Sequence, residues 1–248
     1  MADQGGSTED VNPRTRNIDR IAVRDLAQHM HVENAAVQPA MEGALPAIGD
    51  AITAITERLQ SGGRLIYIGA GTSGRLGVLD SVECPPTFGT RPELVVGVIA
   101  GGVSALTRSI EGVEDDTAQG AADLKDIEVT AKDAVVGISA SGRTPYTLAA
   151  LRRARDVSAC TVAITCNADT PLASAADIAI ELRVGAEVIA GSTRLKAGTA
   201  TKLALNMLST GTMIQLGRTT GNLMSHLMPV CDKLRARQER IRQSLEEK

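Results

Sequence analysis

The sequence predicts an α/β fold, a three-layer αβα sandwich around a five-stranded parallel sheet, with helices at both ends of the chain. Five short apolar runs are separated by helix-compatible sequence, and each is nearly continuous in apolar residues. Strands that are buried on both faces have this composition, and strands that alternate with helices form parallel sheets. The expected strands are residues 65–68, 94–99, 134–138, 161–165 and 178–182. Right-handed crossovers then bring the loops after these strands to one edge, where ligands bind.

Helices are expected before, between and after these strands. From Asn34 to Leu59 apolar residues recur every three or four positions, which predicts one helical face that ends at Ser61-Gly-Gly63. A helix-like stretch covers 75–82, and a long helix is expected over 193–217. Residues 1–17 are polar, and we expect them to be mobile or to wrap over a partner. The chain therefore divides into an N-terminal arm and helical segment (1–60), a central α/β domain (61–220) and a C-terminal helix (221–248).

Composition excludes several classes of function. The net charge of −3 argues against a broad nucleic-acid-binding surface, and the only aromatic residues are Tyr67, Phe88 and Tyr146. No apolar run reaches the roughly 18 residues of a membrane-spanning helix, and the N-terminus does not resemble a signal peptide. We therefore expect a cytoplasmic protein with no membrane or nucleic-acid partner. The four cysteines form no C-x-x-C pair and the three histidines are not placed to share a helix face, so no metal site is expected.

A first candidate site follows the first expected strand. Gly69-Ala-Gly-Thr-Ser-Gly-Arg75 is a glycine- and hydroxyl-rich turn that opens into a helix. Backbone N–H groups and the helix dipole favour a phosphate at such a turn. The spacing also begins like the G-x-G-x-x-G of a dinucleotide site, but the strand over 94–99 ends in Ala100-Gly-Gly-Val103 without the acidic residue that binds a ribose.

A second hydroxyl-rich turn, Ser139-Ala-Ser-Gly-Arg-Thr-Pro-Tyr146, follows the third expected strand. Thr144 can cap the next helix and Pro145 suits its first turn, while Gly142 lets the backbone approach an anion. Either turn alone could be a well-capped loop without a ligand. Two such turns on one sheet edge favour a phosphate site.

Two carboxylates accompany these turns. Glu83 stands before Cys84-Pro-Pro86, and because proline disfavours helical geometry in the preceding residue, we expect the helix to end near Glu83. Glu114 belongs to Glu111-Gly-Val-Glu-Asp-Asp116, a segment expected at the same sheet edge, whereas Asp115 and Asp116 are expected to be solvated. Two carboxylates around one sugar phosphate can divide acid and base roles.

The stretch from Leu65 to Gly89, which contains Gly-Ala-Gly-Thr-Ser-Gly-Arg and Glu-Cys-Pro-Pro-Thr, closely resembles the N-acetylmuramic acid 6-phosphate etherase family of the sugar isomerase (SIS) superfamily. The similarity covers nearly the whole chain. It continues in Asn12-Pro-Arg-Thr-Arg-Asn-Ile-Asp19, in both segments that follow the second and third strands, in Gly185-Ala-Glu-Val-Ile-Ala-Gly-Ser-Thr-Arg-Leu-Lys-Ala-Gly-Thr199 and in Asn206-Met-Leu-Ser-Thr210.

The resemblance implies a lyase that cleaves the D-lactyl ether of N-acetylmuramic acid 6-phosphate to N-acetylglucosamine 6-phosphate and D-lactate, a step in recycling cell-wall sugar. It implies no cofactor, and a homodimer with sites near the interface. Glu83 corresponds to the acid that protonates the leaving oxygen, with a pKa that Pro85, Pro86 and Phe88 could raise by desolvation, and Glu114 to the base at C2. The remaining candidate contacts are the phosphate hydroxyls Thr72, Ser73, Ser139, Ser141 and Thr144, and the sugar-binding side chains Glu187, Ser192 and Lys196.

Two departures from the family pattern concern the C-terminal part. The family usually continues several dozen residues beyond the charged run over 238–248, and Ser225-His226 replaces a usual Val-Asp pair. Two alternatives therefore stand beside the etherase: a non-catalytic sensor of sugar phosphates related to the glucokinase regulator, and an aldose–ketose isomerase of the same fold. Both carboxylates speak against the sensor, and Cys84-Pro-Pro-Thr argues against the isomerase. The substrate anomer and the sharing of the site between subunits are not determined by the sequence.

Overall fold

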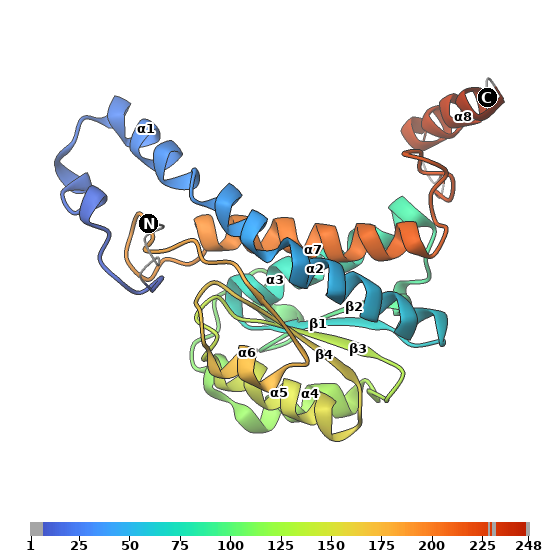
Figure 1. Cartoon of the computed structure of the whole chain (residues 1–248), viewed down its shortest axis with the longest axis horizontal. Coiled ribbons are helices and arrows are strands. Elements are labelled where there is room, and N and C mark those ends of the chain that lie inside the picture. Colours follow the sequence, from blue (N-terminus) through green and yellow to red (C-terminus); the bar gives the residue numbers. More distant parts are fainter. Residues whose placement is uncertain (1–6, 228, 230–231, 247–248) are drawn as a thin grey trace.

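The computed structural model describes residues 7–227, 229 and 232–246 of the chain. Its centre is a sheet of five parallel strands in the order β2-β1-β3-β4-β5 (Figure 1). The strands are β1 (Leu65–Gly69), β2 (Val95–Ile99), β3 (Ala134–Ile138), β4 (Cys160–Thr165) and β5 (Ile178–Glu181). Each predicted strand is confirmed to within one residue at either end. The chain crosses from β1 to one side and from β3 to the other, so the carboxyl ends of β1 and β3 form a topological switch point.

Three helices cover one face of the sheet: α2 (Val37–Gln60), α3 (Gly71–Phe88) and α7 (Lys196–Gln215) (Figure 1). Most of the predicted face of the helix before β1 is confirmed, because Val37, Met41, Ile48, Ile55 and Leu59 are buried in the core beneath it and Ile52 packs against that core. Leu45, which the same periodicity placed on this face, is exposed instead. Since the sheet is apolar on both faces, these helices bury one of its two surfaces and contribute most of the core.

The opposite face is covered by α4 (Thr117–Asp126), α5 (Pro145–Asp156) and α6 (Pro171–Ala175). A second apolar cluster lies beneath them. The two tyrosines are completely buried, one in each cluster. Tyr67 donates its phenolic hydrogen bond to Asp80 and Tyr146 donates to Asp123. Each of these hydroxyls therefore has a carboxylate partner in an otherwise apolar layer.

Helix α3 corrects one prediction from the sequence. The helix does not end at Glu83 but continues to Phe88, with Pro85 and Pro86 inside it, and stops at Gly89 in the left-handed conformation. Cys84 and Phe88, one helical turn apart, are both buried in the core. Their burial outweighs the local preference of residues that precede proline. Glu83 consequently lies on the outer surface of a continuous helix.

The N-terminal segment differs from the prediction as well. Residues 7–17 pack against their own chain, with Thr8, Asn12 and Thr15 buried and a 3₁₀ turn at Pro13–Thr15. The helix α1 (Val23–Asn34) was not predicted, and in Figure 1 it projects away from the sheet at one end of the molecule, whereas the C-terminal α8 (Asp232–Glu246) projects at the opposite end. Its residues are largely exposed, and its one buried side chain is Glu33.

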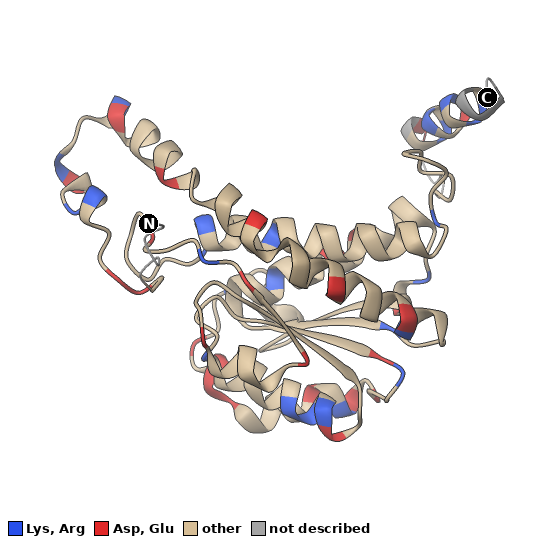
Figure 2. Ribbon diagram, in the orientation of Figure 1, with Lys and Arg blue, Asp and Glu red and all other residues tan. Residues whose placement is uncertain are grey.

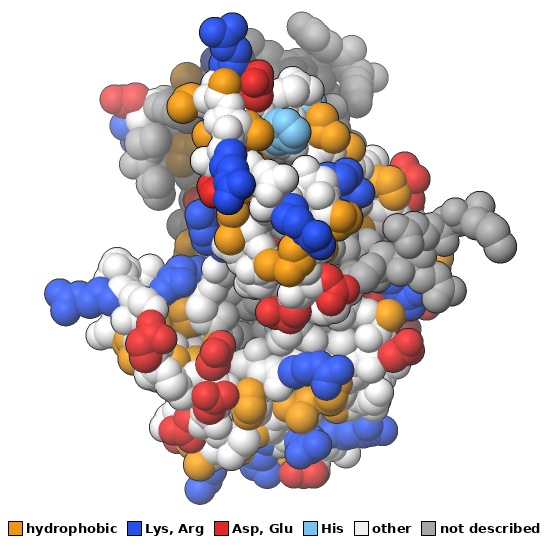
Figure 3. All heavy atoms as spheres, turned by 90° about the vertical axis from the view of Figure 1, so that its left-hand side faces the viewer, with side chains coloured by type: hydrophobic (Ala, Val, Ile, Leu, Met, Phe, Trp, Pro, Cys, Tyr) orange, Lys and Arg blue, Asp and Glu red, His pale blue; other side chains and the backbone are white. Residues whose placement is uncertain are grey.

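Charged residues of both signs are mixed along α4, α5 and α8 (Figure 2), and α8 carries the ion pairs Arg235–Asp232 and Arg242–Glu239. Seen from the side of α1, basic, acidic and hydrophobic side chains are interspersed on the surface (Figure 3). Among the described residues no helix is long and apolar enough to cross a membrane.

Candidate functional site

A cavity of about 310 Å³ opens at the carboxyl edge of the sheet, beside the switch point between β1 and β3. The turn after β1, the turn after β3, the segment before α4 and the start of α7 all contribute to its wall. Its polar lining comprises Glu9, Thr72, Ser73, Glu114, Ser139, Ser141, Thr144, Thr193 and Thr201. The two hydroxyl-rich turns and Glu114, which are separate in the sequence, therefore line one cavity within a single chain.

The turn after β1 presents the beginning of α3 to this cavity. Ala70 occupies the N-cap position and supplies no side-chain cap, so the first N–H groups of the helix face the cavity without that partner. A side chain at Gly74 would meet the Gly69 carbonyl at 2.5 Å and Ile99 at 2.6 Å, which requires glycine at this position. This close packing brings the helix dipole against the end of the sheet, where it favours an anion.

The turn after β3 is held by its own hydroxyl groups. Ser139 Oγ lies 2.8 Å from Thr144 Oγ1 and 3.3 Å from Ser141 Oγ, and it accepts a 3.1 Å hydrogen bond from Gly142 N. Thr144 stands at the N-cap of α5, as predicted, but its side chain makes no cap hydrogen bond because it is engaged with Ser139. The three hydroxyls therefore form one cluster on the cavity wall.

Glycine is required at position 142 for a reason other than the approach of the backbone to an anion. Its φ is +66°, and an added Cβ would lie 2.3 Å from Thr170 Oγ1. Both the left-handed backbone and the contact with the cap of α6 exclude a side chain there.

Glu114 lies in a 3₁₀ turn, Val113–Asp115, that directly precedes α4. The neighbouring Asp116 caps α4 by accepting a hydrogen bond of 2.9 Å from Gln119 N, so it has a structural role in addition to the solvation predicted for it. Glu114 in contrast lines the cavity.

Glu83 lies outside this cavity. It lines a neighbouring hollow of about 250 Å³ between α3 and α7, together with Leu76, Leu79, Asp80, Lys202, Leu205 and Asn206. Leu76 is common to both linings. Glu83 follows Thr72 by eleven residues, which is about 16 Å along a helix that rises 1.5 Å per residue. The expected desolvation is also absent from the single chain, because Phe88 points into the core while Glu83 is exposed.

Glu187 and Lys196 do not line the cavity either, because both are buried in a network of their own. The carboxylate of Glu187 accepts hydrogen bonds from Lys196 N (3.2 Å) and Ala197 N (2.9 Å) at the start of α7. Burial raises the pKa of Glu187 above its usual range. Lys196 Nζ lies 3.2 Å from Glu33 Oε2, and both side chains are 2% exposed. The expectation that these residues contact a sugar finds no support in this arrangement.

Glu33 is the centre of that network. It accepts hydrogen bonds from Asn12 Nδ2 and from the Arg14 guanidinium, in addition to Lys196. The Arg14 hydrogen bonds, those from Asn12 and Lys196 and the Lys196 charge lower the pKa of Glu33 to about 2. Ser192, the third predicted sugar contact, lies in the turn before α7 and is absent from the cavity lining; its carbonyl accepts from Leu195 N.

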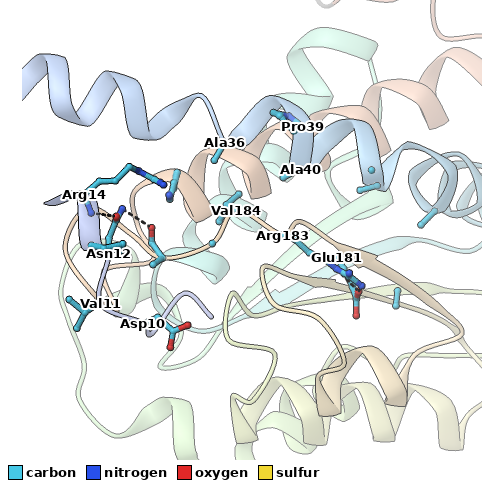
Figure 4. Close-up of a pocket in the computed structure, with 18 residues that line it drawn as sticks. Asp10, Val11, Asn12, Arg14, Ala36, Pro39, Ala40, Glu181, Arg183 and Val184 are labelled. Carbon is cyan, nitrogen blue, oxygen red and sulfur yellow. Dashed lines mark hydrogen bonds and ion pairs between the residues drawn. The ribbon is translucent and has the colours of Figure 1, made fainter. Parts of the chain in front are cut away.

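Another hollow, of about 1010 Å³, lies on the other side of the N-terminal segment. Figure 4 shows Asp10, Val11, Asn12 and Arg14 on one side of it, and on another side Pro39 and Ala40 of α2 with Ala36, the N-cap of that helix. Glu181 and Arg183 at the sheet edge are paired with each other at 2.6 Å. Its cations Arg14, Arg183 and Lys196 therefore all have carboxylate partners within the chain.

Outside the helix after β1 and the turn after β3, the lining also includes Glu9, Gly191, Thr193, Gly198 and Thr201, which sequence reasoning did not single out. Thr201 lies just beyond the stretch 185–199 that was matched to the family. Gly191, Thr193 and Gly198 belong to that stretch, so their hydroxyl and glycine character was a usable signal. Glu9 was not, because it stands in a polar segment with no pattern of its own.

Family models and curated relatives both match this chain. A model of the glucokinase regulatory protein N-terminal SIS domain matches residues 47–155, and a general SIS domain model matches residues 117–211. An N-acetylmuramic acid 6-phosphate etherase from Streptomyces avermitilis is 54% identical over 235 residues, which cover 95% of this chain and 76% of the relative. The protein of the same name from Caldanaerobacter subterraneus is 52% identical, covering 94% of this chain and 76% of the relative.

Solved structures share the fold at much lower identity. A phosphoheptose isomerase from Francisella tularensis superimposes with a TM-score of 0.60 at 18% identity, covering 78% of this chain and 99% of the isomerase. The Vibrio vulnificus NanR protein, solved with ManNAc-6P, gives a TM-score of 0.54 at 15% identity, covering 90% of this chain and 71% of that chain.

Proposed function

The chain belongs to the N-acetylmuramic acid 6-phosphate etherase family, and from this membership we propose that it cleaves N-acetylmuramic acid 6-phosphate to N-acetylglucosamine 6-phosphate and D-lactate. The observation that supports this most directly is the cavity that joins two hydroxyl-rich turns to Glu114. The sensor and isomerase alternatives are not favoured, because relatives of 50% identity and more over the same length carry the etherase name.

The phosphate end of the substrate would bind at the two turns. The first N–H groups of α3 and the hydroxyls of Thr72 and Ser73 offer donors from one side, and the Ser139–Ser141–Thr144 cluster offers donors from the other. Helix dipole and hydroxyl donors together favour a dianion without a cationic side chain.

The chemistry would proceed through the open-chain sugar. Its aldehyde at C1 acidifies the proton at C2, which Glu114 removes as a general base. The electron pair forms the C2–C3 double bond while the C3–O bond breaks, and an acid, which we assign to Glu83, protonates the leaving oxygen so that D-lactate departs. Water then adds across the double bond, with hydroxyl at C3 and hydrogen at C2, which gives N-acetylglucosamine 6-phosphate.

The distance between Glu83 and Glu114's cavity leads us to propose a homodimer in which the partner supplies the acid. Leu79 and Val82 on the outer surface of α3 are 50% and 57% exposed. An antiparallel pairing of two α3 helices about a two-fold axis near Leu79 would cover these side chains. It would also place each Glu83 opposite Arg75 of the other copy, close to the mouth of that copy's cavity.

Arg75 suits this pairing electrostatically. Its guanidinium donates to two backbone carbonyls, of Ala105 (3.0 Å) and of Arg108 (2.9 Å), and no carboxylate of the described residues forms an ion pair with it. A partner's Glu83 would supply that carboxylate, and the covered interface would supply the desolvation that the single chain lacks. We further propose a cytoplasmic location, because a phosphorylated sugar is charged and does not cross a bilayer unaided.

The experiment for the activity is D-lactate release from N-acetylmuramic acid 6-phosphate by the purified chain. Release by the parent and its loss in Glu83→Ala, with N-acetylglucosamine 6-phosphate still bound, is the expected result. Retention of full activity in Glu83→Ala would remove Glu83 from the chemistry.

The experiment for the shared site combines two inactive variants. Glu83→Ala and Glu114→Gln chains, co-expressed in equal amounts, should regain roughly a quarter of parental activity, because half of the dimers are mixed and each mixed dimer has one complete site. Activity no higher than that of the separate variants would show that both carboxylates serve the same chain.

A further inference from the structure

The cavity contains a second carboxylate that the sequence did not suggest, Glu9 of the N-terminal segment. Its neighbour Thr8 is completely buried and anchors the segment beside the cavity. Thr8 N donates to Asn167 Oδ1 at 2.9 Å, Asn167 Nδ2 donates to Thr8 Oγ1 at 2.9 Å, and Gly191 N donates to Thr8 O at 3.2 Å. Glu9 thus follows a residue whose position is determined by both its backbone and its side chain.

The anchor is tied to the turn that carries the hydroxyl cluster. Asn167 lies just after β4, and its Nδ2 also donates to Ala140 O at 3.0 Å. Ala140 stands between Ser139 and Ser141 and lines the cavity itself. One side chain, Asn167, therefore holds the N-terminal segment and the hydroxyl-rich turn in a common frame.

Space for the Glu9 carboxylate is left by Gly191. An added Cβ at this glycine would lie 3.0 Å from Glu9 Oε2, which is tighter than an ordinary contact, and the glycine has a φ of +73°. Gly191 also lines the cavity. The backbone of this loop therefore comes closer to the Glu9 carboxylate than it could if residue 191 carried a side chain.

The negative charge of Glu9 and of the cavity lining limits the groups that Glu9 can bind. Among the residues that the structure describes, the cavity lining holds Glu9 and Glu114 but no lysine, arginine or histidine. A phosphate next to Glu9 would be repelled, whereas the N–H groups and hydroxyls of the two turns attract it elsewhere in the cavity. A carboxylate is an acceptor of hydrogen bonds, and the uncharged part of an amino-sugar phosphate carries hydroxyl and amide N–H donors.

We propose that Glu9 is a substrate-binding residue that accepts a hydrogen bond from the sugar portion of the phosphorylated amino sugar and orients it toward Glu114. The proposal rests on the proposed function for the identity of the sugar phosphate. It goes beyond that function by assigning the N-terminal segment to the binding site and by making Glu9 a determinant of specificity for the sugar over simple phosphate.

The test is calorimetric binding of three probes: N-acetylglucosamine 6-phosphate, glucose 6-phosphate and inorganic phosphate. Glu9→Gln and Glu9→Ala are compared with Asp10→Asn, a matched change at the adjacent carboxylate, which lines the other hollow. We expect Glu9→Ala to weaken N-acetylglucosamine 6-phosphate by about tenfold or more, and Glu9→Gln by less, as for loss of a hydrogen bond to a charged group. The affinity of the Glu9 variants for inorganic phosphate should be equal to that of the parent or higher. Asp10→Asn should bind all three probes with the affinity of the parent.

The two sugar phosphates identify the donor. If glucose 6-phosphate loses as much affinity in Glu9→Ala as the N-acetylated sugar, the donor is a hydroxyl; if only the N-acetylated sugar is affected, it is the amide N–H. Either pattern supports the proposal. Equal affinity of Glu9→Ala and Asp10→Asn for both sugar phosphates would overturn it, as would equal losses for sugar phosphate and inorganic phosphate.

Failure of the proposed function would look different. A parent chain that binds N-acetylglucosamine 6-phosphate in a Glu9-dependent manner but releases no D-lactate would contradict the etherase activity and uphold the role of Glu9. If the parent chain releases D-lactate and Glu9→Ala retains the KM and the affinities of the parent, the etherase activity would be upheld and the role of Glu9 would be contradicted. Absence of any sugar-phosphate binding by the parent would overturn both.

Discussion

The N-termini of α3 and α7 both present backbone N–H groups, but the acceptors that surround these groups differ between the two helices. At α7 a buried carboxylate, Glu187, accepts hydrogen bonds from the first N–H groups. At α3 the N-cap is Ala70, which has no side-chain acceptor, and the first turn opens into a cavity. The fold thus supplies an internal anion to one helix and leaves the other for an external one.

The same contrast extends to the charged groups around each helix. The cation at the start of α7, Lys196, is buried and paired with Glu33, and Arg14 completes that network. In the cavity at α3 the described part of the chain contributes the carboxylates Glu9 and Glu114 and no cation to the lining. A charged residue with its partners inside the chain stabilises the fold, whereas one that faces an open cavity is available for a ligand. Glu187 and Lys196 belong to the first kind, although the motif that contains them resembles a binding loop.

Glu114→Gln should have the largest effect and should leave stability alone. Loss of a general base lowers D-lactate release by about 10²- to 10⁴-fold, because the proton at C2 then has no acceptor. The unfolding free energy should change by less than about 0.5 kcal/mol, since this carboxylate lies at the surface of a cavity. Steady-state lactate release and urea denaturation of the same preparation measure both. A stability loss of the size of the activity loss would place Glu114 with Glu187 as a structural carboxylate.

Lys196→Met should show the opposite pattern. Removal of one partner of a buried ion pair leaves Glu33 insufficiently compensated and lowers the unfolding free energy by about 3 kcal/mol. Lys202→Met, on the exposed surface of the same helix, is the matched control. Urea denaturation distinguishes them. Equal stability of the two variants would mean that the Lys196 network does not contribute what its burial implies.

Acid should weaken the same network. The folded-state pKa of Glu33 is about 2, below its ordinary value of 4.5, so its contribution is fully present above pH 4.5 and is lost as the pH falls toward 2. A depression of this size corresponds to about 3 kcal/mol at most, since one pKa unit is about 1.4 kcal/mol. Urea denaturation at a series of pH values should give a smaller slope below pH 4.5 for Glu33→Gln than for the parent. If the unfolding free energies of the parent and of Glu33→Gln fall in parallel with pH, the lowered pKa of Glu33 would be contradicted.

Asn167→Ala should give the smallest effect. The substitution removes the side-chain hydrogen bonds to Thr8 and to Ala140 O, worth about 1 kcal/mol each, and releases the N-terminal segment from the cavity. We expect KM for the sugar phosphate to rise a few-fold and hydrogen exchange at Gly191 N, which donates to Thr8 O, to accelerate. Ser174→Ala, a local change within α6, is the control. Unchanged exchange would show that the segment is held by other contacts.

The parts of the fold that could be predicted from the sequence are those specified locally. Apolar runs gave all five strands, and a hydroxyl-rich turn after β1 and another after β3 gave the wall of the cavity. Glu114 was predicted beside them because the carboxyl ends of parallel strands meet at one edge. The end of α3 was wrong, because burial of Cys84 and Phe88 overrides the effect of the prolines.

The contacts that escaped prediction join segments far apart in the chain. Glu33 and Lys196 are separated by 163 positions, and Thr8 and Asn167 by 159. Neither pair leaves a periodic or motif signal. The sequence could therefore indicate that Lys196 was important without showing that its partner lay in the N-terminal helix, and it could not bring Glu9 to the cavity.

The two buried tyrosines make each layer of the sandwich spectroscopically distinct. The chain has no tryptophan, so its near-ultraviolet signal comes almost entirely from Tyr67 under α2, α3 and α7 and from Tyr146 under α4 and α5. Burial raises the pKa of both phenols above the ordinary value, so neither forms tyrosinate until its own layer opens. With Tyr67→Phe and Tyr146→Phe, the absorbance of the remaining phenol during alkaline exposure would report whether the two sides of the sheet separate together or one before the other.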